Sequence, residues 1–120
     1  MKLSLVATTI FILTLGFYTP KVTAAPTKTP KTFTEWCQQK ASLSKETRRT
    51  VEALLKVAKT QNCSQANQTL TKLTTLYLGE NQISDIKPLS NLTNLTFLDL
   101  WGNPLTSQQC PLKPEYICRF

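Results

Sequence analysis

Residues 70–105 read LTKLTTLYLGENQISDIKPLSNLTNLTFLDLWGNPL, and this stretch matches itself when position 70 is placed over position 92. The matching positions follow the pattern LxxLxLxxNxI, which occurs twice in register. The matched pairs are Leu70 with Leu92, Leu73 with Leu95, Leu76 with Leu98, Leu78 with Leu100, Asn81 with Asn103 and Ile83 with Leu105. This pattern predicts a repeat architecture, in which each copy buries its apolar side only against its neighbours.

The spacing within each copy predicts a short strand followed by an irregular segment that leads the chain back to the start of the next strand. We call this segment the return. Leu76 and Leu78 are two positions apart, so their side chains point to the same side of a strand. Asn81 and Asn103 are expected inside the turns, where a carboxamide can bond backbone groups that would otherwise lie buried without partners. The return turns apolar groups inward and contains a proline, which suits an irregular turn better than a long helix. Its residues are Ile83, Ile86, Pro88, Leu89 and Leu92.

The pattern LxxLxLxxNxI is the signature of leucine-rich repeats. The return segment, ISDIxPLxxLTNL at residues 83–95, resembles the 22-residue class of bacterial leucine-rich repeats, the type seen in internalin-like proteins. The resemblance implies an α/β fold: a short right-handed solenoid with a parallel strand ladder on its concave face and 3₁₀-type turns on its convex face. Folds of this kind are nearly always binding scaffolds.

The resemblance extends beyond the repeat. The motif NPLxxxxCPxxPxxIC at residues 103–118 and the pattern WC…TRxTVxALL…C at residues 36–63 resemble the ends of small secreted bacterial leucine-rich repeat proteins. We therefore expect a helical N-terminal cap over residues 32–72, leucine-rich repeats over residues 73–105, and a disulfide-stapled C-terminal cap over residues 106–120. One repeat is complete, against a usual minimum of about three, so the caps must supply much of the core.

Residues 1–24 have the order of segments found in a secretory signal peptide. Lys2 precedes a mostly apolar run from Leu3 to Phe17, and Val22-Thr23-Ala24 forms a small-residue cleavage site. This run of about 15 residues is shorter than the roughly 20 that span a bilayer, and an uncleaved anchor is the alternative. Residues 25–31, APTKTPK, are expected to form a flexible linker. The mature protein is expected to be secreted or periplasmic, monomeric and without a membrane span.

Four cysteines lie outside the repeat, two on each side of it: Cys37, Cys63, Cys110 and Cys118. An even number in an exported chain indicates disulfides, and four cysteines allow three pairings. We favour Cys37–Cys63 and Cys110–Cys118, because each pair would close one end of the repeat. By chain-entropy arguments they contribute about 3–4 and 2–3 kcal/mol respectively. A four-cysteine zinc site would lack the usual Cys-x-x-Cys spacing, so no metal is expected.

The segment before the repeat predicts short helices at both ends of the N-terminal cap. Residues 32–35, TFTE, have the form of a capping box and are expected to start a helix that continues to Lys40. Ser64 is expected to cap another short helix that ends near Leu70. Trp36 is either a packing residue beside a disulfide or an exposed ligand contact, and we favour packing.

Between them, residues 45–59 predict an amphipathic helix capped by Ser44. Arg48–Glu52 and Glu52–Lys56 are expected to form ion pairs on its polar face. The glutamates among these basic residues, and the lack of a basic run with stacking aromatics, argue against nucleic-acid binding. The apolar stripe consists of Val51, Leu54, Leu55 and Ala58.

The composition argues against catalysis. The chain has no histidine, which removes Ser-His-Asp, Cys-His and histidine–metal mechanisms. Its three glycines form no phosphate-binding loop, and no cofactor is expected. Glu80 and Asp99 could reach the separation used in glycoside hydrolysis, but on a nearly flat surface. The net charge of +7 becomes +5 if Lys2 and Lys21 leave with the signal peptide, a mild bias compatible with acidic glycans or envelope surfaces.

The register of the repeat places the candidate ligand-binding residues on the concave strand face. Large aromatic groups have no core to fill there and are common interface anchors, although they could equally pack across strands and bind nothing. We expect noncovalent recognition of a protein. The alternatives are carbohydrate or cell-envelope binding by the same aromatic patch, and a structural protein without a specific ligand. The candidate residues are Thr75, Tyr77, Glu80, Phe97, Asp99 and Trp101.

Overall fold

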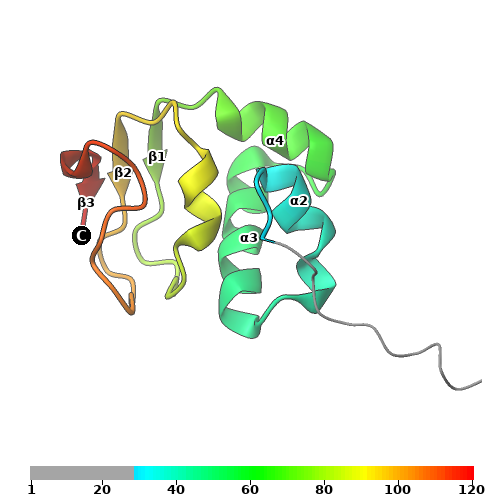
Figure 1. Cartoon of the computed structure of the whole chain (residues 1–120), viewed down its shortest axis with the longest axis horizontal. Coiled ribbons are helices and arrows are strands. Elements are labelled where there is room, and N and C mark those ends of the chain that lie inside the picture. The colour runs from blue at the N-terminus through cyan, green and yellow to red at the C-terminus, as the bar shows by residue number, and fades with distance from the viewer. Residues whose placement is uncertain (1–28) are drawn as a thin grey trace, which may run out of the picture.

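The computed structural model describes residues 29–120. The predicted signal peptide, residues 1–24, and most of the linker predicted at residues 25–31 lie outside the described residues. The described part consists of a group of helices followed by an open three-stranded parallel sheet (Figure 1). Over these residues, no helix combines the length and the apolar character that a bilayer span requires.

Three α-helices form the N-terminal part of the described residues: α2 (Phe33–Gln38), α3 (Lys45–Ala58) and α4 (Cys63–Thr71). The predicted caps of the first two are confirmed, since the side chain of Thr32 accepts from the amide of Glu35 and that of Ser44 from the amide of Thr47. The helix α4 is capped by Asn62, so the predicted cap at Ser64 is wrong. Asn62 caps as well as serine does, and its side chain accepts from the amide of Gln65.

The first helix is shorter than predicted. It ends at Gln38, and the predicted continuation through Lys40 is replaced by a 3₁₀ turn, η2 (Lys40–Ser42). This turn packs against α3 and changes the charge pairing there, because Glu52 pairs with Lys40 at 3.7 Å. The predicted ion pairs of Glu52 with Arg48 and Lys56 are absent from the described residues, and Arg48 instead donates to the carbonyl of Leu43 at 3.0 Å.

The apolar stripe of α3 lies in the core, as its spacing predicts. Val51, Leu54 and Leu55 are buried, and Ala58 is partly buried. Trp36 is also buried, which supports the packing interpretation, and its indole N–H donates to the side-chain carbonyl of Asn91 at 3.2 Å. The core of the helical part therefore continues into the repeat without a break.

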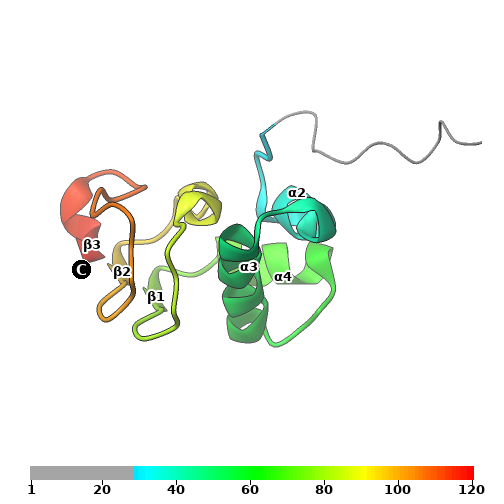
Figure 2. The same ribbon diagram turned by 90° about the horizontal axis from the view of Figure 1, so that it is seen from below.

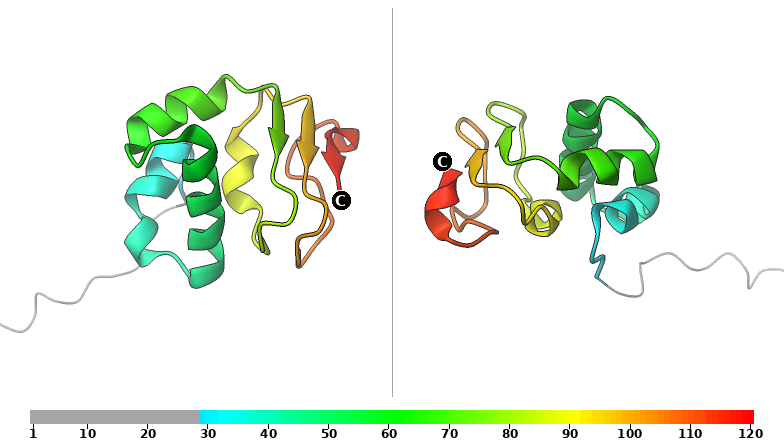
Figure 3. Two further views of the ribbon diagram at one scale, coloured as in Figure 1. Left: turned by 180° about the vertical axis from the view of Figure 1, so that it is seen from behind. Right: turned by 90° about the horizontal axis from the view of Figure 1, so that it is seen from above.

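The sheet follows the 22-residue period. Its strands are β1 (Thr75–Tyr77), β2 (Phe97–Asp99) and β3 (Cys118–Arg119), in the order β1-β2-β3 and all parallel. Leu76 lies opposite Leu98, as the predicted repeat requires. The helices lie at the β1 end of the sheet, so β3 forms the far edge (Figure 3). The strand β3 was not predicted.

The return segment contains a 3₁₀ helix, η3 (Lys87–Asn91), which lies across the repeat from the strands (Figure 2). Pro88 occupies its first turn, where the missing amide hydrogen has no helical partner to lose. A second short 3₁₀ helix, η4 (Glu115–Ile117), precedes β3. The inward leucines of the strand segments and the inward leucines and isoleucine of the first return segment fill one common core. The fully buried ones are Leu78, Ile83, Leu89, Leu92, Leu98 and Leu100.

Both favoured disulfides are confirmed. Cys37–Cys63 joins α2 to α4, and Cys110–Cys118 joins the loop after the second repeat to β3, each with 5.6 Å between the Cα atoms. Each bond lies within one end of the fold, so in the described part neither disulfide connects the helices to the repeat. That junction contains hydrogen bonds to Asp85, whose carboxylate accepts from the Thr47 hydroxyl and whose carbonyl accepts from the Thr50 hydroxyl.

Candidate functional site

The outward side chains of the three strands and the turns that follow them form one surface, which we call the strand face. It consists of Thr75, Tyr77, Phe97, Asp99, Trp101 and Arg119. The leucines between these positions are buried, whereas Tyr77 is 67% exposed and Trp101 is 51% exposed. The alternation of the strands therefore turns these two rings away from the core, as the sequence predicts.

Phe97 has a different environment from the other two rings. Its ring lies 5.8 Å from that of Tyr77, measured between centroids, with 56° between the planes. Phe97 is level with Thr75 in the register, so Tyr77 is its diagonal neighbour. Aromatic pairs at this distance stabilise neighbouring strands. Phe97 is only partly exposed and supports Tyr77, while the outer side of Tyr77 stays accessible.

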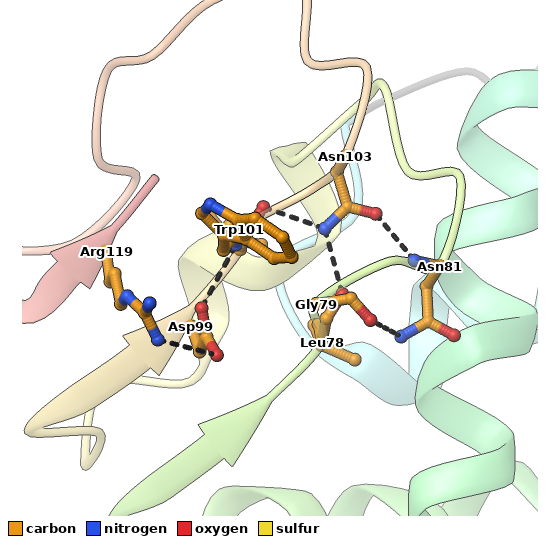
Figure 4. A network of polar contacts seen from close by, with 8 residues as sticks. Leu78, Gly79, Asn81, Asp99, Trp101, Asn103 and Arg119 are labelled. Carbon is orange, nitrogen blue, oxygen red and sulfur yellow. Dashed lines mark hydrogen bonds and ion pairs between the residues drawn. The ribbon is translucent and has the colours of Figure 1, made fainter.

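Asp99 is one of the candidate ligand-binding residues predicted from sequence, but its carboxylate already has partners within the protein. Its Oδ1 accepts the amide of Trp101 at 3.0 Å, and its Oδ2 lies 3.5 Å from Nη1 of Arg119 (Figure 4). The Asp99 side chain is only 15% exposed. Asp99 thus fixes the turn that carries Trp101, and its charge is partly balanced by the neighbouring strand.

Gly79 leaves room for the Trp101 turn to lie close to the end of β1. A Cβ atom at Gly79 would lie 3.1 Å from the carbonyl oxygen of Trp101 and 3.7 Å from Oδ2 of Asp99. The first distance is tighter than most real Cβ contacts, and the atom involved is backbone. The close approach of the two turns therefore favours glycine at this position.

Arg119 is the strand-face residue that the sequence did not suggest. It comes from β3, which has only two residues and lacks the LxxLxL spacing. Its place depends on tertiary contacts, because Asp99 pairs with Arg119 in the parallel register and the Arg119 carbonyl accepts the amide of Leu100 at 2.8 Å. The Arg119 side chain is 59% exposed, so its guanidinium remains open to solvent.

Glu80 lies beyond the end of β1, in the turn that follows it. Its backbone has a left-handed φ of 56°, and its amide donates to the carbonyl of Trp101 at 2.9 Å. Its side chain reaches over Gly102, because a Cβ atom there would lie 2.7 Å from Cγ of Glu80. Glu80 is exposed at the edge of the strand face, beside the Trp101 turn.

The two repeat asparagines have different environments. The side chain of Asn103 accepts from the amides of Asn81 and Ile83 at 2.9 and 3.0 Å, and donates to the carbonyls of Leu78 and Leu100 at 2.8 Å each. It thereby joins the two successive repeats, each of which we call a coil (Figure 4). Asn81 differs from the expectation, because it is exposed. Among residues 29–120 its side chain donates only to the carbonyl of Gly79, at 3.1 Å. The coil before it is replaced by helices, which offer no matching turn.

A comparison with protein-family models identifies the repeat. Residues 71–113 match the family model described as Leucine Rich repeats (2 copies). Residues 71–113 therefore contain two leucine-rich repeats. The chain matches none of the curated proteins with which it was compared, and it matches no solved structure. Within residues 29–120, no three carboxylate or thiol side chains gather in a way that could hold a metal ion.

Proposed function

We propose that this protein is an exported module for noncovalent protein recognition, and that its partner binds the strand face. Leucine-rich repeats are typical of protein–protein interaction, which supports a protein as partner. The two disulfides are compatible with an oxidising compartment outside the cytoplasm. No step of this proposal requires a catalytic residue or a cofactor.

The observation that carries the proposal is the exposure of Tyr77 and Trp101 on a rigid backbone. The core of the repeat is filled by leucine and isoleucine side chains without these two rings. The backbone of Trp101 is held at both groups, since its amide donates to Asp99 and its carbonyl accepts from Glu80. Exposed aromatic side chains on a fixed backbone lose little conformational entropy on binding, and tyrosine and tryptophan are the commonest interface anchors.

The polar groups around the two rings would then set the orientation of the bound partner. Arg119 offers a partly exposed guanidinium beside Asp99 on the strand face. Glu80 offers an exposed carboxylate beside the Trp101 turn. Such groups at the edge of an interface affect specificity and association rate more than they affect affinity. The partner is therefore expected to insert apolar groups between the rings and to place charges of both signs around them.

The test is affinity capture from envelope and secreted fractions of the source cells, followed by a binding titration with the captured partner. Tyr77→Ala and Trp101→Ala are compared with Tyr116→Ala. Tyr116 is 85% exposed on η4 and lies outside the strand face, so it is a matched control for the loss of a surface aromatic. Each strand-face variant should weaken binding by about 30-fold or more, the effect of losing an anchor worth about 2 kcal/mol. Equal weakening by all three variants would contradict the proposal.

Carbohydrate binding is the second candidate function, and one observation favours it. The aromatic contact of the strand face joins Tyr77 to Phe97 and leaves out Trp101, so the Trp101 ring can stack on a sugar. Retention on cell-envelope polysaccharide that depends on Trp101, without a captured protein, would support this candidate. Identical behaviour of all variants in both assays would support a structural protein with no specific ligand.

A further inference from the structure

A cavity lies away from the strand face, where three distant segments of the chain meet. Thr29, Pro30 and Trp36 form one wall. Residues of η3 and those directly before it form the second, and the loop at residues 106–111 forms the third. In Figure 2 these segments lie on the side of the molecule opposite the strands. The cavity has a volume of about 440 Å³. This volume is within the range of small-molecule sites. We call it the η3 cavity.

The walls of the η3 cavity are held in place by hydrogen bonds between segments that are distant in sequence, and by a disulfide. Asn91 at the end of η3 binds the N-terminal wall twice: its Oδ1 accepts from the indole of Trp36, and its Nδ2 donates to the carbonyl of Lys31. On the other side, the Thr106 hydroxyl donates to the carbonyl of Ser84 at 3.2 Å, and Cys110 is fixed by its disulfide. The cavity is therefore largely preformed, which lowers the cost of ordering on binding.

The lining combines apolar surface with one available cation. Pro30, Trp36, Ile86 and Pro111 contribute the apolar part. Lys87 also lines the cavity, and within residues 29–120 its ammonium group forms no ion pair.

Asp85 is the other charged residue of the lining, and its carboxylate already has partners. One oxygen accepts from the hydroxyl of Thr47, and the other accepts the amide of Lys87 at 3.0 Å. Both carboxylate oxygens of Asp85 are thus bound within the protein, whereas the ammonium of Lys87 is available to a ligand.

We propose that the η3 cavity is a second binding site, and that it takes a small organic anion: an apolar ring or chain that carries one carboxylate. The apolar part contacts Ile86 and the two prolines, and the carboxylate pairs with Nζ of Lys87. This site is separate from the strand face, so the proposal does not depend on the proposed protein recognition.

The two tryptophans of the chain make the proposal directly testable, because one belongs to each site. Trp36 lines the η3 cavity with its indole N–H bonded to Asn91, and Trp101 lies on the strand face. The probe is phenylacetate, and phenylacetamide is its uncharged control of the same shape. The indole N–H signals of the ¹⁵N-labelled protein are followed by NMR during each titration.

Phenylacetate should shift the Trp36 signal saturably, with a dissociation constant on the order of 1 mM for so small a ligand, and should leave Trp101 unchanged. Lys87→Gln should weaken this binding about three- to fivefold, the range for a partly exposed ion pair. Lys72→Gln removes a lysine outside the lining and should have no effect. Ser107→Phe, which fills the cavity from its exposed rim, should abolish the shift.

Three outcomes would overturn the proposal. One is a Trp36 signal that does not saturate or move, and another is a shift confined to Trp101. The third is equal binding of phenylacetate and phenylacetamide, because the site would then not select an anion. The shift of Trp101 on adding the protein partner is measured separately, so failure of the η3 cavity and failure of the strand face give different results.

Discussion

The asymmetry between the two repeat asparagines leads to a sharp prediction about stability. Asn103→Ala removes four hydrogen bonds, all between 2.8 and 3.0 Å, and three of them join Asn103 to the preceding repeat. Asn81→Ala, the same substitution at the equivalent repeat position, removes one exposed side-chain bond of 3.1 Å. A sequence pattern alone would assign the two asparagines equal importance.

The expected magnitude follows from the number and burial of these bonds. A typical intramolecular hydrogen bond contributes about 1 kcal/mol, and a buried group left without a partner costs about 1–3 kcal/mol. Asn103 is half-buried, so water can reach some of the four groups that it leaves behind. We expect Asn103→Ala to lower the free energy of unfolding by about 2–4 kcal/mol, and Asn81→Ala to lower it by about 0.5 kcal/mol or less.

Equilibrium urea unfolding of both variants, followed by far-UV circular dichroism and analysed by linear extrapolation, measures the difference. The slope m should stay unchanged, since neither substitution changes the surface exposed on unfolding. If the two substitutions lower stability equally, within about 0.5 kcal/mol, the bonds of Asn103 to the neighbouring coil do not carry the stability assigned to them.

Three further predictions concern the core, the junction and a turn. Leu98→Ala, at a fully buried position of β2, should cost about 2–5 kcal/mol in urea unfolding; a loss below about 1 kcal/mol would contradict a shared core. Asp85→Ala removes the acceptor of Thr47 between α3 and the repeat, and should cost about 1–3 kcal/mol, with faster amide hydrogen exchange at the start of α3. The backbone of Gly102 has a left-handed φ of 78°. Gly102→Ala should therefore lower the free energy of unfolding by about 1–2 kcal/mol, measured as a fall in the thermal midpoint. Gly102→Asn should lower it by less, because asparagine tolerates this conformation better.

Local rules correctly predicted the caps of the first two N-terminal helices and the buried side of α3, but not the cap of α4, the end of α2 or the contacts between these elements. The caps Thr32 and Ser44 and the apolar stripe of α3 depend on near neighbours along the chain. The partners of Glu52 do not, since the nearest cation in the fold belongs to η2. The helix spacing that predicts an ion pair is therefore overruled when a tertiary neighbour competes for the same carboxylate.

The same division applies to the strand face. The exposure of Tyr77 and Trp101 follows from the alternation of side chains along a strand, which the positions of the leucines already set. The role of Asp99 does not follow from that alternation. Its carboxylate binds the amide of Trp101 and the guanidinium of Arg119, and the second partner comes from a strand with no repeat signature.

The amino-acid sequence by itself determined the repeat, the inward leucines and the outward rings, because each depends on spacing along the chain. It favoured one of three cysteine pairings, and the tertiary structure decided between them. The tertiary structure also decided which polar side chains meet. Asn81 and Asn103 occupy the same repeat position, but only Asn103 follows another coil and can bond its backbone. The strand β3 and the η3 cavity likewise arise from segments distant in sequence, and no local pattern records where such segments come together.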